Sequence, residues 1–166
     1  AGEVLRIGLL LAGIGALWLG LGRDCLADEA DDQYAVAAGH YARGRWQLAA
    51  EEFEVFLNKH SAHPKAHQAR FHLGKSLLQL GRVEQAVSHF QAYLAAEPQG
   101  EFSRQAQFRI AEAAFLAGKH GEAAPLLERF LKQHPDDRLL AYVLAYLGGV
   151  YLGRGDAAAA VRHFRD

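Results

Sequence analysis

The chain has 166 residues, of which 51% are hydrophobic and 22% charged, and its formal net charge is −1. This composition is typical of a folded globular protein rather than a disordered one, and the lack of a basic excess argues against nucleic acid as a partner. The single cysteine, Cys25, excludes an internal disulfide and a multi-cysteine metal site. Because the sequence contains no methionine, we expect it to be part of a longer chain.

The first predicted element is an apolar segment over residues 7–22, bounded by Arg6 and Arg23. A helix of this length would span roughly 24 Å, less than the roughly 30 Å of a membrane's hydrocarbon core. One positive charge, a moderately long apolar run and small residues after it are typical of a secretory signal peptide. We therefore predict a signal peptide over residues 1–27, cleaved before Asp28.

An uncleaved membrane anchor is the alternative for this segment. Small residues recur in it every four positions, as they do where membrane helices pack closely: Gly8, Ala12, Ala16 and Gly20. In that case residues 7–22 would attach the protein to the inner membrane. Acidic residues follow the segment, whereas cytoplasmic flanks are rich in Lys and Arg. Under both alternatives, residues 28–166 are expected to be exported and to lie in the periplasm.

From about residue 30 onward the sequence repeats with a period of 37 residues. Glycine and alanine recur at fixed positions: Gly44, Gly81, Gly118 and Gly155; Ala49, Ala86, Ala123 and Ala160. Large apolar residues recur after the alanines: Phe53, Phe90, Leu127 and Phe164; Phe56, Tyr93 and Phe130; Leu57, Leu94 and Leu131. Apolar and then small residues recur before the glycines: Val36, Leu73, Ile110 and Leu147; Ala37, Gly74, Ala111 and Gly148. The copies cover about 30–64, 67–101, 104–138 and, incompletely, 141–166.

Each copy has the pattern of a helical hairpin. Apolar residues at helical spacing run to the glycine, which ends a helix in the left-handed conformation, and a second apolar stripe follows. The predicted helices cover residues 30–43, 46–59, 64–80, 83–96, 102–117, 120–133, 138–153 and 156 onward. Pro64 is expected at the first position of its helix. One hairpin cannot bury its own apolar face, so neighbouring copies must stack.

The columns resemble the tetratricopeptide repeat. The resemblance rests on two copies: Leu73-Gly74, Leu77, Gly81, Ala86, Phe90 and Pro98; Leu147-Gly148, Tyr151, Gly155, Ala160 and Phe164. It covers residues 30–166, but the family's early Trp is absent and the period exceeds the usual length of about 34 residues. The resemblance implies an all-α, right-handed solenoid of stacked antiparallel helix pairs. The longer period is similar to that of exported bacterial members, the Tol–Pal cell-envelope coordinator and the lipoprotein of the outer-membrane barrel-assembly machine.

In such a solenoid the first helix of each pair lines the concave face. The candidate partner-binding residues at these positions are Tyr34, Tyr41, Gln68, Phe71, Lys75, Gln105, Phe108, Glu112, Phe115 and Tyr142. Exposed aromatic rings would anchor a peptide or a helix. The alternative is that Phe71, Phe108 and Phe115 pack between neighbouring repeats. The polar members, Gln68, Lys75, Gln105 and Glu112, are expected to take no part in stacking.

No motif predicts catalysis, because the sequence lacks a Gly-rich phosphate loop, a His-Glu-x-x-His motif and a nucleophile elbow. His60, His63, His67 and His72 lie close together, but Pro64 separates His63 from the following helix and no acidic or cysteine ligand is near. No metal or cofactor is therefore predicted.

The predicted function is a non-catalytic protein–protein interaction module of the bacterial cell envelope that binds a peptide or helix on its concave face. The alternatives are a structural or oligomerisation element of a larger envelope complex, and an accessory domain of a longer exported enzyme.

Overall fold

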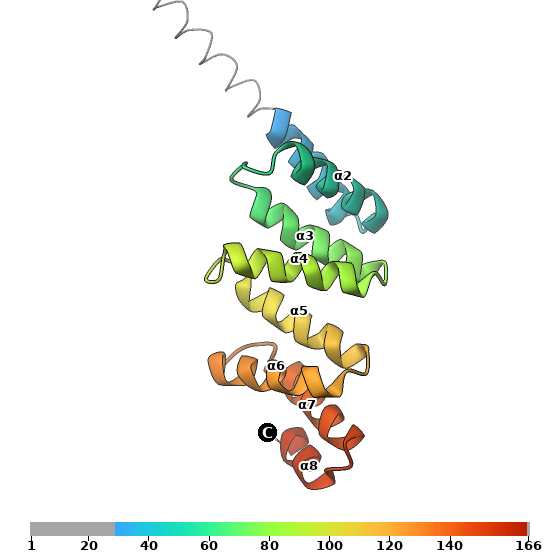
Figure 1. Ribbon diagram of the computed structural model, residues 1–166, viewed down its shortest axis with the longest axis vertical. Helices are drawn as coiled ribbons and strands as arrows, with labels where there is room; N and C mark the ends of the chain where they lie inside the picture. The colour runs from blue at the N-terminus through green and yellow to red at the C-terminus, as the bar shows by residue number, and fades with distance from the viewer. Residues whose placement is uncertain (1–28, 166) are drawn as a thin grey trace, which may run out of the picture. The chain divides into compact units, whose positions relative to one another are not determined.

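The computed structural model describes residues 29–165, and all regular secondary structure in this range is helical (Figure 1). The first helix covers residues 29–42. It is followed by α2 (Trp46–Lys59), α3 (Ala66–Gln79), α4 (Val83–Ala96), α5 (Ser103–Leu116), α6 (His120–Gln133), α7 (Leu140–Gly153) and α8 (Ala157–Arg165). The all-α prediction is confirmed for these residues, and the predicted helix boundaries lie within two residues of the observed ones. The segment over residues 7–22 and the predicted cleavage site lie outside the described residues.

The start of α3 differs from the prediction. Residues 61–65 form turns, and the helix begins at Ala66 rather than at Pro64. The backbone N–H of Lys65 donates to Nδ1 of His63 at 3.2 Å, and the N–H of Ala66 donates to the His63 carbonyl at 2.9 Å. These two bonds hold Pro64 in a turn, so it precedes the helix.

The described residues form two compact units, divided between Ala66 and His67, and each is described by itself. The N-terminal unit consists of the helix over residues 29–42 and α2, which pack through aromatic rings. The ring of Tyr34 lies 5.9 Å from that of Phe53 and 5.5 Å from that of Phe56. The C-terminal unit contains α3 to α8, which form three successive helix pairs.

Val36 departs from its repeat column. Leu73 and Leu147 are fully buried at the equivalent position, whereas Val36 is 49% exposed. Tyr34 and Ala37, which are buried, lie three residues apart and so share one face of the first helix. Val36 lies about 100° away from Ala37 around the helix axis. Membership of the apolar column therefore does not by itself place Val36 in the core.

The glycine column makes the tight turns inside the helix pairs. Gly44, Gly81, Gly118 and Gly155 have φ angles of 69°, 73°, 70° and 79°. Residues with a Cβ atom rarely adopt this left-handed conformation, whereas glycine adopts it freely. Glycine therefore recurs because each copy reverses direction in the same way.

The alanine and phenylalanine columns pack the two helices of a pair together. Ala49, Ala86, Ala123 and Ala160 are all buried. Phe90 of α4 is fully buried against α3, where a Cβ atom added to Gly74 would lie only 2.8 Å from its ring. In this pair the close approach of α4 therefore requires a small residue at Gly74.

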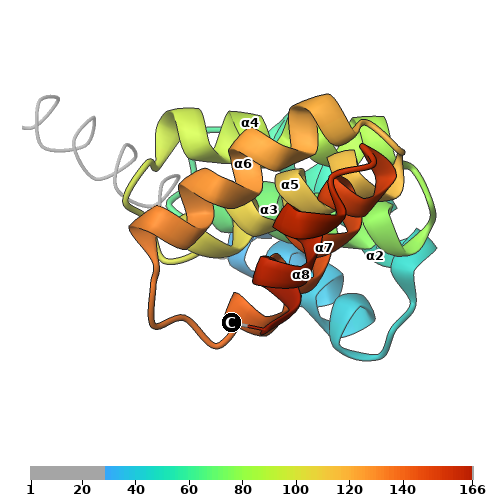
Figure 2. The same ribbon diagram turned by 90° about the horizontal axis from the view of Figure 1, so that it is seen from below.

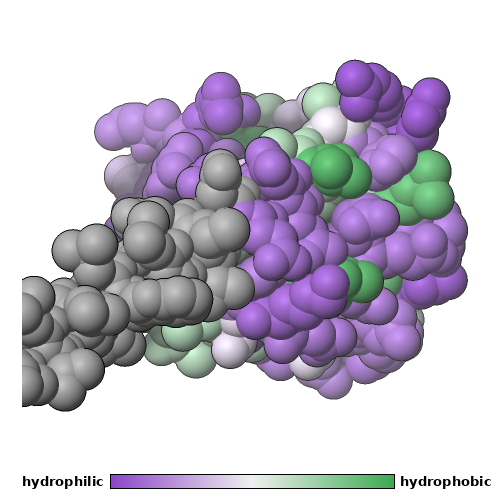
Figure 3. All heavy atoms as spheres, turned by 90° about the horizontal axis from the view of Figure 1, so that it is seen from above, coloured by the Kyte–Doolittle hydropathy of each residue, from purple (hydrophilic) through white to green (hydrophobic). Residues whose placement is uncertain are grey.

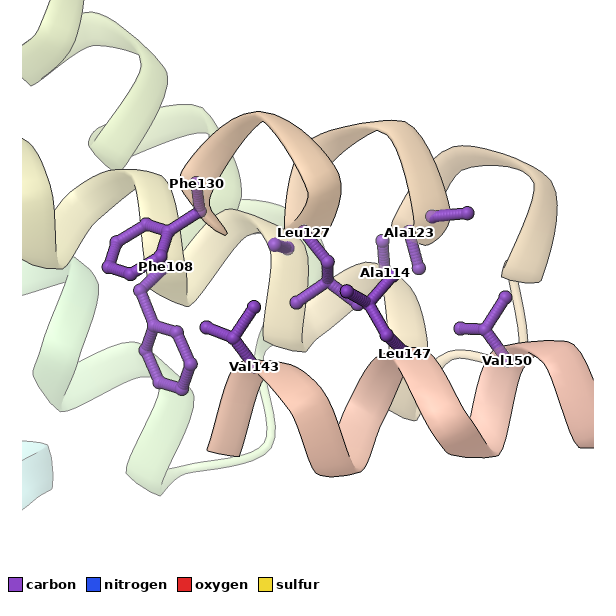
Figure 4. Close-up of a cluster of buried hydrophobic side chains, with 10 residues drawn as sticks. Phe108, Ala114, Ala123, Leu127, Phe130, Val143, Leu147 and Val150 are labelled. Carbon is purple, nitrogen blue, oxygen red and sulfur yellow. The ribbon is translucent and has the colours of Figure 1, made fainter. Parts of the chain in front are cut away.

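The core of the C-terminal unit extends from one helix pair into the next. Figure 4 shows side chains from α5, α6 and α7 meeting in one apolar cluster. Its members are Phe108, Ala111, Ala114, Ala123, Ala124, Leu127, Phe130, Val143, Leu147 and Val150. A cluster that draws on successive pairs is what stacking of repeats requires.

One backbone N–H in each loop between pairs is bound by a different side chain. The N–H of Lys65 donates to the His63 imidazole, as described above. One repeat later the N–H of Phe102 donates to the Tyr93 hydroxyl at 3.0 Å. In the third loop the N–H of Leu139 donates to the Asp137 carboxylate at 2.7 Å. The three N–H groups are equivalent in the repeat, so the loops keep one conformation although their sequences differ.

Candidate partner-binding surface

Most of the candidate residues lie on the inner face, by which we mean the surface of α3, α5 and α7 on the side away from α4 and α6. The aromatic candidates differ in exposure. Phe71 and Phe108 are buried, with their rings against α4 and α6, and Tyr34 is buried in the N-terminal unit. These three rings therefore serve packing and present no surface to a partner, contrary to the prediction that they line a groove.

Neighbouring rings explain why Phe71 and Phe108 are buried. Phe102, which stands just before α5, stacks on Phe71 with 4.5 Å between ring centroids and an interplanar angle of 9°. Phe108 packs between Phe130 of α6, at 5.8 Å, and Tyr146 of α7, at 6.2 Å. Phe71 also packs on Phe90 and Tyr93 of α4, at 5.6 and 5.8 Å. Each ring is thus covered by its paired helix and by a residue from the following repeat.

Tyr41 and Phe115 are half-buried. The Tyr41 ring lies 5.4 Å from that of Trp46. Phe115 lies 4.7 Å from Tyr146, and a Cβ atom added to Gly149 would come within 3.0 Å of the Phe115 ring. The close approach of α5 and α7 at this point depends on the missing side chain of Gly149.

Exposed apolar side chains of the C-terminal unit are concentrated on the first helices. Hydrophilic residues predominate on the face drawn in Figure 3, with few apolar side chains among them. On α5 and α7, in contrast, Leu116 is 70% exposed, Leu152 60% and Tyr142 59%. Tyr142 is the one aromatic candidate with most of its side chain accessible.

The polar candidates fall into two groups. Gln68, Lys75 and Gln105 are half-buried on α3 and α5, and the Lys75 ammonium stands 5.8 Å from the centroid of the Phe71 ring. Glu112, in contrast, is bound by two other side chains of the same unit. It accepts a hydrogen bond from the Tyr146 hydroxyl at 2.9 Å and one from the Arg109 guanidinium at 2.5 Å.

The prediction that Glu112 takes no part in stacking is therefore wrong, because its bond to Tyr146 joins α5 to α7. Tyr146 was missed from the sequence, although it occupies the same repeat column as Arg109 and His72. Burial, followed by the hydrogen bond to Glu112, raises the pKa of Tyr146 to about 12. The phenol is therefore protonated at neutral pH and acts as the donor.

A pocket of about 260 Å³ opens between α3 and α5. Its lining mixes charged and apolar side chains: Lys75, Leu78, Arg109, Glu112, Ala113 and Leu116. Lys75 and Arg109 are cationic and Glu112 is anionic, so the lining of the pocket carries one more positive than negative charge. Its chemistry suits an apolar side chain that is followed or preceded by an acidic one.

The histidines do not form a metal site within residues 29–165, where no group of three or more His, Cys, Asp or Glu side chains could hold an ion. His60 packs on the Phe56 ring at 5.5 Å, and His63 lies 3.6 Å from the Asp31 carboxylate. In the C-terminal unit, His67 lies 3.8 Å from Glu97, and His72 packs on the rings of α3 and α5. These side chains serve local contacts.

None of the helices in the described part of the chain combines the length and apolarity that a membrane crossing requires. The proposed attachment through residues 7–22 falls outside that part.

Comparison with known proteins identifies the repeat. Two family models described as tetratricopeptide repeat match the chain, one over residues 34–101 and the other over residues 104–147. Among solved structures, MamA from Desulfovibrio magneticus is similar with a TM-score of 0.69 at 18% identity, over 82% of this chain and 72% of that one. A tetratricopeptide repeat protein from Parabacteroides merdae has a TM-score of 0.70 at 15% identity, over 83% of this chain and 52% of its own. No curated protein matches the chain. At these identities the two structures show the fold alone, the stacking of antiparallel helix pairs.

Proposed function

Because this chain belongs to the tetratricopeptide repeat family, we propose that it is a non-catalytic protein-interaction module whose inner face binds an extended or helical segment of a partner. Helical repeat arrays present long surfaces to which partner segments bind. The observation that carries the proposal is the exposure of Leu116, Tyr142 and Leu152 on the first helices. Groups of large exposed apolar side chains on soluble proteins commonly mark binding sites.

The pocket between α3 and α5 supports a specific kind of partner segment. Lys75 and Arg109 favour an acidic side chain, while Leu78 and Leu116 favour an apolar one beside it. Lys75 and Arg109 are the two cations of this pocket through which a partner's charge would act. The partner segment is thus expected to carry an apolar and an acidic residue at adjacent positions on one side.

Serine substitutions on the inner face test this proposal. Leu116→Ser and Tyr142→Ser remove exposed apolar surface, so they should leave the fold intact and lower partner recovery at least tenfold in quantitative pull-downs from bacterial envelope fractions. Val161→Ser is the matched control, because Val161 is 47% exposed on α8, a second helix. Equal recovery by the inner-face variants and the parent would contradict the proposal. Recovery of further copies of this chain alone would favour the oligomerisation element instead.

We also propose that the repeats act in the bacterial cell envelope, as do the exported members that the longer period resembles. The apolar residues 7–22 and the acidic residues that follow them support export. Expression in a Gram-negative host should yield a mature protein that begins at Asp28 and is digested by protease added to spheroplasts. An intact N-terminus on a membrane-bound product would favour the anchor, and complete protection from protease would contradict export.

A further inference from the structure

In the C-terminal unit α5 lies between α4 and α6 along the chain of stacked helices (Figure 1, Figure 2). Side chains of these three helices line a groove, with those of α5 as its floor. It consists of two pockets of about 340 and 260 Å³ that share Gln91, Ile110 and Leu126. The floor is apolar and receives a residue from each helix: Leu94, Ile110 and Leu126. All three are only partly buried, so an apolar side chain of a ligand could cover them.

The exposed apolar floor of this groove is not found at the equivalent position of the next repeat. Ile110 is partly exposed in the groove, whereas Leu147, at the equivalent position one repeat later, is fully buried. Repeats that stack in the same way would bury both positions alike. The uncovered floor above Ile110 is therefore not a general consequence of repeat stacking.

The two ends of the groove differ in charge. Where α4 and α6 begin, the charged residues of the lining are Glu84, Glu122 and Lys119. Toward the C-terminal ends of α4 and α6, the charged residue that lines the groove is Arg129. Arg129, Glu84 and Glu122 are exposed, and within residues 29–165 none of their side chains forms an ion pair or a hydrogen bond.

Amide side chains surround the basic end. Gln91, Gln107 and Gln133 line the pocket that holds Arg129. A glutamine amide both donates and accepts hydrogen bonds, which suits the N–H and C=O groups of an extended backbone. A guanidinium suits a carboxylate. This end of the groove is thus built for a peptide that carries an acidic side chain.

We propose that the groove binds an extended peptide with a basic residue at the Glu84 and Glu122 end, an apolar side chain over Ile110 and an acidic side chain at Arg129. From Glu84 to Leu94, α4 rises about 15 Å, which an extended strand covers in about five residues. The basic and acidic residues of the peptide are therefore four to six positions apart, about one strand length. The groove adjoins the pocket between α3 and α5, with which it shares Val83 and Ala113. Glu84, Glu122 and Arg129 line the groove alone, so charge variants at these positions distinguish this site from the function proposed above.

Selection from a displayed library of random octapeptides, embedded within a carrier protein, tests the proposal on the full chain. The selected peptides should share the basic, apolar and acidic residues in that order. Their affinity is then measured by fluorescence anisotropy with labelled synthetic peptides. Arg129→Glu should weaken binding about tenfold or more, as expected for loss of a charge-assisted contact.

Two variants serve as controls. Lys132→Glu makes the same charge reversal on an exposed position of α6 that lies outside both pockets, and it should bind like the parent. Lys75→Glu alters only the inner face and should also bind like the parent. Replacing the acidic residue of the peptide by Lys should restore binding to Arg129→Glu. Unchanged far-ultraviolet circular dichroism will establish that the Arg129 variant is folded.

Three results would overturn the proposal. The first is a selection that enriches no octapeptide over passage through blank resin. The second is a set of selected peptides that bind Arg129→Glu as tightly as the parent. The third is binding that requires a free peptide C-terminus, since the carboxylate would then come from the chain end rather than from an acidic side chain.

Discussion

Replacing Gly74 by alanine tests how closely α3 and α4 approach each other. The added Cβ atom would lie 2.8 Å from Cε1 of Phe90 and 3.1 Å from Cδ1 and Cζ of the same ring. Because Phe90 is fully buried, its ring has no free volume to move into. The helices must separate slightly to accommodate the methyl group.

Two effects of opposite sign determine the outcome. Alanine favours a helix over glycine by about 1 kcal/mol, whereas overpacking a core costs about 1–3 kcal/mol. Gly74→Ala should therefore lower the free energy of unfolding by up to about 2 kcal/mol. The matched control is Gly121→Ala in α6, where nothing lies within 4 Å of the added atom. That variant should gain up to about 1 kcal/mol.

Urea unfolding of both variants, followed by far-ultraviolet circular dichroism, gives the comparison. The midpoint of Gly74→Ala should lie below that of the parent, and the midpoint of Gly121→Ala at or above it. If Gly74→Ala proves as stable as Gly121→Ala, the close contact between Gly74 and Phe90 is not present in solution, and the explanation of the small-residue column fails with it.

Further predictions concern titration and packing in the same unit. Burial lowers the pKa of His72 from 6.5 to about 4. Because the unfolded chain binds this proton at a higher pH than the folded chain does, the free energy of unfolding should fall by up to about 3 kcal/mol as the pH drops from 6.5 to 4. In urea titrations His72→Leu should show a smaller fall over the same pH range. Tyr146→Phe should cost about 1–2 kcal/mol by removing the bond to Glu112, and in Glu112→Gln the ultraviolet titration of Tyr146 should move from about 12 toward its ordinary pKa of 10.0. Phe90→Ala should cost about 3–5 kcal/mol through the cavity it leaves, and Ala86→Leu about 1–3 kcal/mol through overpacking; thermal melts like the parent's would show that the helix interface lies elsewhere.

Most of the fold could be predicted from the repeat columns. Every copy needs the same left-handed turn and the same close helix contact, so glycine recurs at Gly81 and its equivalents and alanine at Ala86 and its equivalents. The start of α3 could not be predicted in the same way. It depends on the side chain of His63, and the equivalent loops use other residues for the same hydrogen bond.

The candidate site could be predicted less well, because its burial depends on contacts between different repeats. Phe71 lies in a first helix at a position predicted from the sequence to line the concave face, but Phe102 from the following loop stacks on it. Glu112 is engaged by Tyr146, which comes from the next pair. The residues at the positions of Phe102 and Tyr146 in the other copies are different, so these two contacts do not recur. The burial of Phe71 itself does recur, because Tyr34, Phe71 and Phe108 share one column and each ring packs on a ring of its paired helix. Tyr142 stays accessible, and its role in binding stays a prediction.

The order of helix contacts in the C-terminal unit has a consequence for how this part of the chain folds. From α4 to α8 the packing joins each helix to its neighbour in sequence, and α5 also to α7. Such contacts close only short loops, and proteins built from them fold fast, because little chain entropy is lost before each contact forms. We expect folding to begin at the best-packed pairs, around the cluster of α5, α6 and α7, and to spread outward pair by pair. Amide hydrogen exchange should then be slowest in α5 and α6 and faster in α8, as in a chain whose repeats are coupled only to their nearest neighbours.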